Sequence, residues 1–347
     1  MNLRSIVRKF LNKIDLIIIK FSSKNMFLSN LYYLLFSKAF SREHQSVLVG
    51  KLKHIDEVNN KKGNNYQLVR NIHRIEKGLL MRPRRPVFAK SYIAETIELF
   101  EVEWINSVNS NIQIQWFHDV LNEYFKNCAS DEIIDKQADK FYSLLNGRQF
   151  IPNEEHFKKP YRRETVEKTD ISFDELYQLT RQRRSVRWFS DKDVSRELID
   201  KAILAANQSP SACNRQPFEY RIIDEPELLS KVVNVPMGTR GYAENIPVMI
   251  VCVGNLDAYF SERDRHLIYI DASLANMSLM LALETLGLSS CPINWPDIEA
   301  KEKEMAKLLG LGMHQRPIMC IGLGYADPKG KIAFSEKRGL ESIRTYN

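Results

Sequence analysis

The stretch that decides the fold reads Arg181-Gln-Arg-Arg-Ser-Val-Arg-Trp-Phe189, and it directly follows a segment with helical periodicity. It places three guanidinium groups and one hydroxyl within five residues: Arg183, Arg184, Ser185 and Arg187. Charges this close repel one another unless an anion or a set of carbonyl groups neutralises them, and a phosphate group suits such a cluster. Taken alone, the stretch is also typical of a solvated helix end.

A second polar stretch follows about one helix later and reads Ser209-Pro-Ser-Ala-Cys-Asn-Arg-Gln-Pro-Phe218. Its small hydroxyl and amide side chains, Ser211, Asn214 and Gln216, stand on a backbone restricted by two prolines. Such donors and acceptors suit a planar heterocycle that carries ring carbonyls and ring nitrogens. The two stretches together therefore indicate a site for a phosphate-bearing heterocycle.

The order and spacing of these stretches resemble the nitroreductase family, whose flavin-dependent oxidoreductases carry the motifs R-R-S-x-R-x-F and P-S-x-x-N-x-Q-P. Here they stand as Arg183-Arg-Ser-Val-Arg-Trp-Phe189 and Pro210-Ser-Ala-Cys-Asn-Arg-Gln-Pro217. The resemblance runs from about residue 171 to the C-terminus and does not cover the N-terminal extension.

Apolar periodicity predicts an α+β fold for the second half of the chain, preceded by an all-α domain. Short apolar runs at 218–223, 247–253 and 316–322 predict strands among helices, without the regular alternation of a doubly wound sheet. The resemblance implies a mixed, mostly antiparallel sheet flanked by helices. Helical patterns in the first half lie at 66–76, 91–108, 114–127 and 131–145.

Composition shifts divide the chain into four parts. These are a basic amphipathic arm (1–53), a helical domain (54–145), a polar, proline-containing linker (146–170) and a final domain (171–347), for which the resemblance implies FMN binding. The linker precedes Ser172-Phe-Asp-Glu175, whose spacing is that of a capping box.

The net charge is concentrated in the arm. Residues 1–53 hold ten bases and two acids, a net charge of +8, whereas the whole chain carries +7. The rest of the chain is nearly neutral, so we expect no nucleic-acid partner. The apolar runs of the arm are too short to span a membrane. Two interpretations stay open: peripheral contact with an anionic membrane, or a helix docked on its own domain.

Five widely spaced cysteines without a C-x-x-C pair favour a reduced, cytoplasmic protein. The seven histidines show no metal-ligand spacing, so we expect no metal. No residue can be nominated as the catalytic acid or base.

The resemblance implies an FMN site. Arg183 and Ser185 would bind the phosphate together with Arg338, Arg187 would face the pyrimidine edge of the flavin ring, and Asn214 and Gln216 would bind ribityl and ring atoms. A third segment, Gly287–Pro296, would supply backbone N–H groups near flavin N5. The full set of expected cofactor-binding residues is Arg183, Arg184, Ser185, Arg187, Pro210, Ser211, Ala212, Asn214, Gln216, Pro292, Ile293, Asn294 and Arg338.

The third segment departs from the family pattern at Trp295, where a small residue is common. We expect the indole to lie beside the isoalloxazine, where it would stack a flat substrate or narrow the entrance.

The function implied is an FMN-dependent oxidoreductase that uses NADH or NADPH to reduce a small organic molecule. Two alternatives stay open. One is a flavin enzyme with a dedicated substrate, acting by azoline oxidation or reductive dehalogenation. The other is a non-enzymatic flavin-binding module at a membrane assembly. The segment 266–286 is apolar nearly all round, which together with the resemblance predicts a homodimer.

Overall fold

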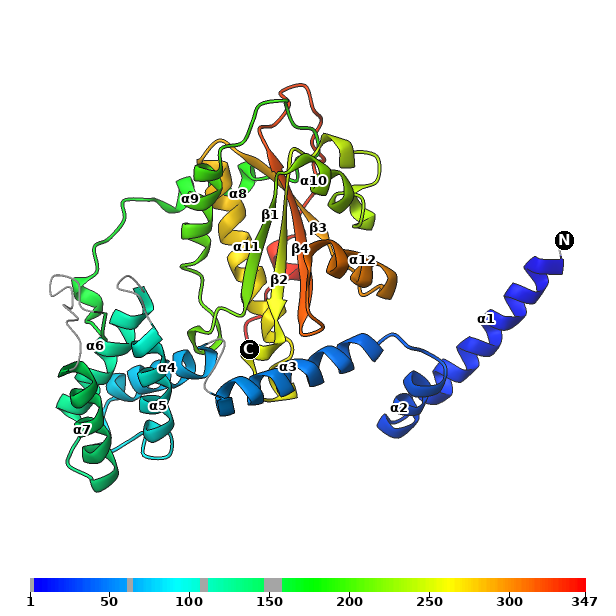
Figure 1. Ribbon diagram of the computed structural model, residues 1–347. Coiled ribbons are helices and arrows are strands. Elements are labelled where there is room, and N and C mark those ends of the chain that lie inside the picture. The colour runs from blue at the N-terminus through cyan, green and yellow to red at the C-terminus, as the bar shows by residue number, and fades with distance from the viewer. Residues whose placement is uncertain (1–2, 61–64, 107–111, 147–157) are drawn as a thin grey trace.

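The computed structural model describes residues 3–60, 65–106, 112–146 and 158–347. Residues 147–157 of the predicted linker lie outside the described residues. Figure 1 shows an elongated chain with a helical domain on one side, a sheet domain in the centre and two helices that project away. The longer helices are α1 (Leu3–Ser22), α2 (Met26–Leu35), α3 (Ser41–Asn60), α4 (Tyr66–Leu80), α5 (Ile93–Asn106), α6 (Ile112–Asn127), α7 (Glu132–Asn146), α8 (Phe173–Gln182), α9 (Arg196–Ala206), α10 (Pro226–Val232), α11 (Leu267–Thr285) and α12 (Glu299–Leu309).

Four antiparallel strands form one sheet in the order β1-β2-β4-β3. The strands are β1 (Phe218–Ile223), β2 (Val248–Asn255), β3 (Ser289–Asn294) and β4 (Gln315–Gly324). Every residue of β2 is buried, as expected for a central strand covered on both faces. The predicted α+β fold with helices before the sheet is confirmed.

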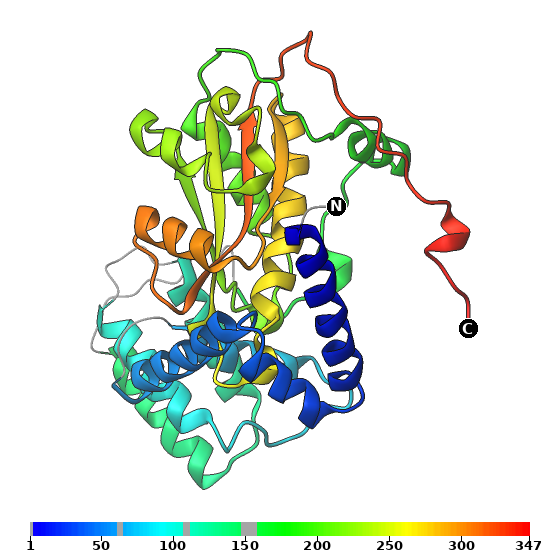
Figure 2. The same cartoon turned by 90° about the vertical axis from the view of Figure 1, so that its right-hand side faces the viewer.

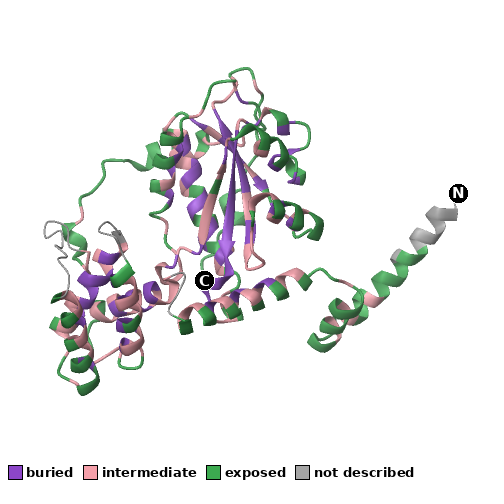
Figure 3. Ribbon diagram, in the orientation of Figure 1, coloured by how far each residue is buried: buried purple, intermediate pink, exposed green. Residues whose placement is uncertain are grey.

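Two apolar clusters sandwich this sheet. On one face, α9 and α11 pack through Ile199, Leu279 and Leu283. On the other face, the chain around α10 and α12 packs through Val232 and Met305. Figure 3 shows the resulting buried centre, with exposed residues on the outer faces of the helices and in the loops.

One strand was missed by the sequence analysis. The third segment is largely β3, which pairs with β4 at the end of the four-stranded sheet. Pro292 lies within it, and proline is tolerated at a sheet edge because no ladder partner needs its missing N–H.

The helical domain, α4 to α7, has a core of its own. Aromatic and aliphatic side chains from all four helices meet in it, including Ile72, Phe100, Phe117 and Phe141, none of which is exposed.

Helix α3 joins the N-terminal part of the chain to the sheet domain and runs through residue 53, where the arm was expected to end. A Cβ at Gly50 would lie 2.7 Å from the Cβ of Leu256, so only glycine allows this close approach. Lys53 Nζ donates to Asp257 Oδ2 over 2.7 Å, which fixes α3 beside the end of β2.

Among the described residues, one segment, Glu262–Thr285, is long and apolar enough to cross a membrane by length and composition. It contains α11, whose buried side, with Ala275 and Leu279, packs on α9 and the sheet. A helix in the core of a sheet domain can be equally long and apolar, and α11 lies in such a core.

Candidate functional site

The arginine stretch is placed by a helix end and a strand start. Ser172 and Glu175 form the predicted capping box at the start of α8, and Arg183 ends that helix by donating its N–H to Leu179 O. The chain then runs beside β3: Val186 N donates to Ser290 O over 3.0 Å, and Ser185 pairs with Ser290 in a parallel bridge. Because Val186 is buried, the polar side chains around it are held at the sheet edge.

The cationic side chains of this stretch have few partners of their own. The Nε atom of Arg183 is buried without a hydrogen-bond partner, as is the nearby Ser290 Oγ. Arg187 donates from Nη1 to the carbonyl of Ser185, and its Cζ lies 5.8 Å from the centre of the Tyr242 ring. Within the described residues, neither Arg183 nor Arg187 makes an ion pair with a carboxylate. An anion such as a phosphate would satisfy these donors.

The third segment meets the arginine stretch at the same sheet edge. Ser290 begins the run that continues to Pro292, Ile293 and Asn294, and Asn294 is exposed. We call residues 290–294 together with residues 183–187 half-site one.

The expectation for Trp295 is wrong. Its indole is 8% exposed and its Nε1 donates to Glu302 Oε1 over 2.9 Å. Arg316 Nη2 donates to the same oxygen over 3.0 Å, and both charged side chains are buried. The indole is therefore held in the core by Glu302 of α12, which Arg316 of β4 holds in turn, and it does not shape a pocket.

The second stretch lies at the C-terminal end of α9. Ser209 Oγ donates to Ser278 Oγ over 2.9 Å, and Ala212 N donates to Asp271 Oδ2 over 3.0 Å, so α11 holds the loop. Gln216 N donates to Ser211 Oγ over 3.0 Å. We call residues 209–216 half-site two.

The backbone of half-site two is strained. Cys213, Asn214 and Gln216 have φ angles of 55°, 54° and 49°, a region that non-glycine residues rarely adopt. Each such residue costs of order 1–3 kcal/mol and persists only where its surroundings hold it, which is common at ligand sites.

The structure does not bring the two half-sites together within one chain. Gln182 Nε2, next to half-site one, donates to Glu284 Oε2 in the last turn of α11, whereas Ala212, in the middle of half-site two, is tied to Asp271 in the first turns. At 1.5 Å per residue these anchor points are about 20 Å apart along the helix. Figure 1 shows α8 and the loop after α9 at opposite ends of α11.

Arg338 lies apart from both half-sites. Residues 331–347 are exposed throughout, and Figure 2 shows this C-terminal segment leaving the body of the chain. Its one described link to half-site one is Phe334, whose ring centre lies 5.9 Å from Arg184 Cζ. Within the described part of the chain, Arg338 makes no hydrogen bond or ion pair.

Sequence reasoning missed a row of arginines beside half-site two. Arg70 and Arg74 of α4 lie with their Cζ atoms 4.7 and 3.7 Å from the rings of Phe260 and Tyr92. Burial, followed by the positive charges of Arg74 and Arg215, lowers the pKa of Arg70. Neither Arg70 nor Arg74 forms an ion pair among the described residues. Their spacing of four was visible in the sequence, but the contact of α4 with residues 212–214 was not.

The loop arginines after α4 do not form such a cluster. Arg82, Arg84 and Arg85 are all exposed, and Arg84 reaches only Asn127. This segment is a solvated loop. Among the described residues, no group of three or more His, Cys, Asp or Glu side chains is arranged to hold a metal ion.

The comparisons with known proteins place the second half of the chain in a family. The model of the nitroreductase family matches residues 180–239 and 234–325, which include both half-sites. Residues 180–325 are thus similar to the nitroreductase family, and a helical extension precedes them.

Several relatives carry more particular names. The chain is 28% identical over 156 residues to a putative NADH dehydrogenase/NAD(P)H nitroreductase of Methanothermobacter thermautotrophicus, covering 45% of this chain and 79% of that protein. It is 21% identical over 254 residues to iodotyrosine deiodinase 1 of Mus musculus, covering 64% of this chain and 85% of that protein.

Solved structures with the same kind of domain include an FMN-dependent nitroreductase from Clostridium difficile R20291. It is 23% identical, with a TM-score of 0.42, and the match covers 49% of this chain and 98% of that structure.

Proposed function

We propose that this chain is an FMN-dependent oxidoreductase that uses NADH or NADPH to reduce a small organic acceptor. The observation that carries the proposal is half-site one, where Arg183 Nε is buried without a partner, Ser185 pairs with β3 and Arg187 bonds back to the Ser185 carbonyl. These donors fit the phosphate and pyrimidine edge of FMN. When bound, the flavin supplies the electron-transfer chemistry, and the protein binds and orients it.

The separation of the half-sites supports a homodimer. If Ser211, Asn214 and Gln216 contact the same flavin as Arg183, they must come from a second copy, because about 20 Å separates the anchor points of the half-sites in one chain. The outer face of α11 suits such a contact, since Ile270, Leu274 and Met277 are 52%, 46% and 39% exposed. A patch of this kind marks an interaction surface.

The arginine row supports an anionic acceptor. Arg70 and Arg74 border half-site two and lack ion-pair partners among the described residues, and their stacking on aromatic rings fixes them in place. Preorganised guanidinium groups bind carboxylates and phosphates well because little entropy is lost on binding.

A second candidate function is reductive dehalogenation. Several relatives, from mammals, Hydra vulgaris and Thermotoga neapolitana, are named iodotyrosine deiodinases, at 21–27% identity. An iodotyrosine carries a carboxylate, which the arginine row would also accept.

The direct test is the visible absorption spectrum of the purified protein, followed by anaerobic addition of NADH or NADPH. The proposal predicts a bound oxidised flavin that either nucleotide bleaches. A flavin that dithionite bleaches but neither nucleotide does would favour the dedicated-substrate alternative, which iodotyrosine turnover then tests. Protein that purifies without flavin and does not take up added FMN would contradict both.

A further inference from the structure

The N-terminal helices α1 and α2 form an exposed pair with no core of their own. No residue of α2 is buried, although eight of its ten residues are apolar or aromatic: the helix reads Met-Phe-Leu-Ser-Asn-Leu-Tyr-Tyr-Leu-Leu. Phe27, Leu34 and Leu35 are 74%, 75% and 64% exposed. Figure 1 shows both helices projecting from the body, and Figure 3 shows them exposed along the described length.

Helix α1 carries an apolar stripe. Phe10, Ile14, Ile17 and Phe21 recur at a spacing of three or four residues, so they share one face of the helix. All four are exposed, between 39% and 66%. Lys13 and Lys20 lie together along one side of this stripe on the helical wheel, so basic side chains border the apolar face.

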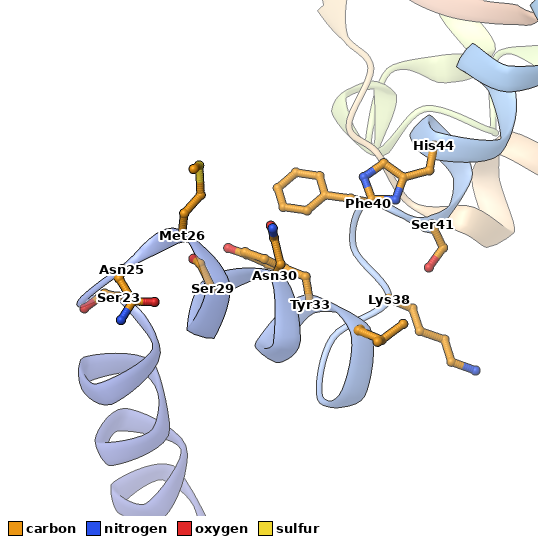
Figure 4. A pocket seen from close by; sticks show the side chains of 11 residues that line it. Ser23, Asn25, Met26, Ser29, Asn30, Tyr33, Lys38, Phe40, Ser41 and His44 are labelled. Carbon is orange, nitrogen blue, oxygen red and sulfur yellow. The ribbon is translucent and has the colours of Figure 1, made fainter. Parts of the chain in front are cut away.

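The stripe is not used to join the arm to the body. The joint is a groove of about 930 Å³ between α2 and the start of α3, lined by polar and aromatic side chains. Figure 4 shows Tyr33 of α2 beside Phe40 and His44. The rings of Tyr33 and Phe40 lie 4.5 Å apart. The exposed apolar faces of α1 and α2 therefore remain uncovered by the rest of the chain.

The charge of this segment limits what can cover those faces. Residues 1–40 hold seven bases and a single acid, Asp15. An apolar face flanked by such an excess of bases complements a surface that offers negative charge and an apolar interior together. An anionic phospholipid bilayer offers both. A membrane-spanning role does not fit, since α2 has ten residues and charged residues interrupt α1.

We propose that α1 and α2 bind the surface of an anionic phospholipid bilayer. The apolar stripe of α1 and the exposed side chains of α2 enter the boundary between headgroups and acyl chains, and the lysines contact lipid phosphates. The arm thereby holds the catalytic domain at the membrane surface, where its substrates would be lipid-linked or interfacial. This binding does not depend on the flavin, so it is testable even if the proposed enzymatic function fails.

The experiment is co-sedimentation of the full-length protein with two kinds of vesicle, one of phosphatidylcholine alone and one with equal amounts of phosphatidylcholine and phosphatidylglycerol. We expect binding to the anionic vesicles at low salt and weaker binding at high salt, since salt screens the lysine contacts. Absence of binding to the anionic vesicles, or equal binding to both kinds at every salt concentration, would overturn the proposal.

Matched variants assign the binding to the arm. Lys13→Gln, Lys20→Gln and Lys24→Gln together should weaken partitioning onto anionic vesicles roughly 100-fold, at about a factor of five per base. The control replaces three exposed lysines of the body, Lys201, Lys303 and Lys307, by Gln and should leave binding unchanged. Equal losses in both sets would mean that general charge, not the arm, drives binding, which would overturn the proposal.

A second set tests the apolar faces. Phe27→Ser, Leu34→Ser and Leu35→Ser together should abolish most binding, whereas Ile105→Ser with Ile133→Ser, exposed positions in the helical domain, should not. All five side chains chosen on the arm and body are exposed, so the melting temperature should stay the same. If the arm set instead halves the mass measured by light scattering and leaves vesicle binding intact, the arm is a contact between subunits and the proposal is wrong.

Discussion

Asp271 in α11 accepts a hydrogen bond from the backbone N–H of Ala212 over 3.0 Å. This bond ties half-site two to the central helix of the sheet domain. It also holds a loop in which three non-glycine residues have positive φ angles. A few such contacts hold the strained loop in place. Their removal should therefore weaken ligand binding at the site more than it disturbs the rest of the fold.

The first prediction concerns Asp271. Asp271→Ala leaves the Ala212 N–H without its partner and should lower the free energy of unfolding by about 1–3 kcal/mol and weaken flavin binding. Asp271→Asn keeps an acceptor oxygen and should preserve both. Chemical denaturation and flavin titration of the two variants measure this, and equal losses in both would show that the bond to Ala212 is not what matters.

The same pair gives a pH dependence. Burial raises the pKa of Asp271, so the folded state favours the protonated carboxyl. The stability that Asp271 contributes is therefore fully present below its unfolded pKa, near 4, and is lost as the pH rises through the folded value. Asp271→Asn does not titrate, so its stability relative to the wild type should increase as the pH rises from about 4 toward neutrality. A difference that stays constant with pH would contradict this.

The second prediction concerns the phosphate position. Arg183→Ala removes a charge-assisted contact and should weaken FMN binding by about 1.5–3 kcal/mol, or roughly 10- to 150-fold. Arg196→Ala is the control, because Arg196 is an exposed arginine paired with Asp224 on the sheet-domain surface. Fluorescence titration with FMN measures the affinity of both variants. Unchanged affinity in the Arg183 variant would remove the phosphate assignment.

The third prediction concerns the buried partners of Trp295. Glu302→Gln removes the buried one of the two carboxylates that Arg316 contacts and leaves the more exposed Asp297 at 2.6 Å, so it should cost about 1–3 kcal/mol. Trp295→Phe removes only the indole hydrogen bond and should cost about 1–3 kcal/mol. Because the indole lies in the core, neither change should alter the KM for an acceptor in the protein that remains folded. A changed KM with unchanged stability would mean that Trp295 lines the substrate pocket and would contradict its place in the core.

The fourth prediction concerns the arginine row. Arg70→Gln with Arg74→Gln should raise the KM for para-nitrobenzoate about tenfold or more and leave that for neutral para-nitrobenzamide unchanged. Arg263→Gln is the control, since Arg263 also lies over the Phe260 ring but is exposed. Equal effects on the two acceptors would mean that the row is structural.

Local signals made much of the fold predictable. The capping box at Ser172 and Glu175, the apolar runs of β1, β2 and β4, and the apolar helix α11 each depend on residues close together in sequence. Strand β3 was missed because its sequence, Ser-Ser-Cys-Pro-Ile-Asn, has no apolar alternation and contains a proline. Pairing with β4 overrides that weak local preference.

The site was less predictable because its geometry depends on contacts between residues that belong to different elements of the fold. The burial of Trp295 depends on Glu302 and Arg316, which belong to other elements. The two motifs are close in sequence, yet α9 carries the chain from one end of α11 to the other between them. The arginine row depends on how the helical domain docks, and nothing in the sequence resemblance covers that domain.

The central claim is that one flavin site takes Arg183 from one chain and Asn214 from another. The measurement is the flavin content of a heterodimer, purified with two different tags, in which one chain carries Arg183→Ala and the other Asn214→Ala. Each homodimer has two impaired sites, whereas the heterodimer would have one intact site and one that is doubly impaired. The account predicts one tightly bound flavin per heterodimer. A heterodimer that binds flavin as weakly as the two parent homodimers would contradict it.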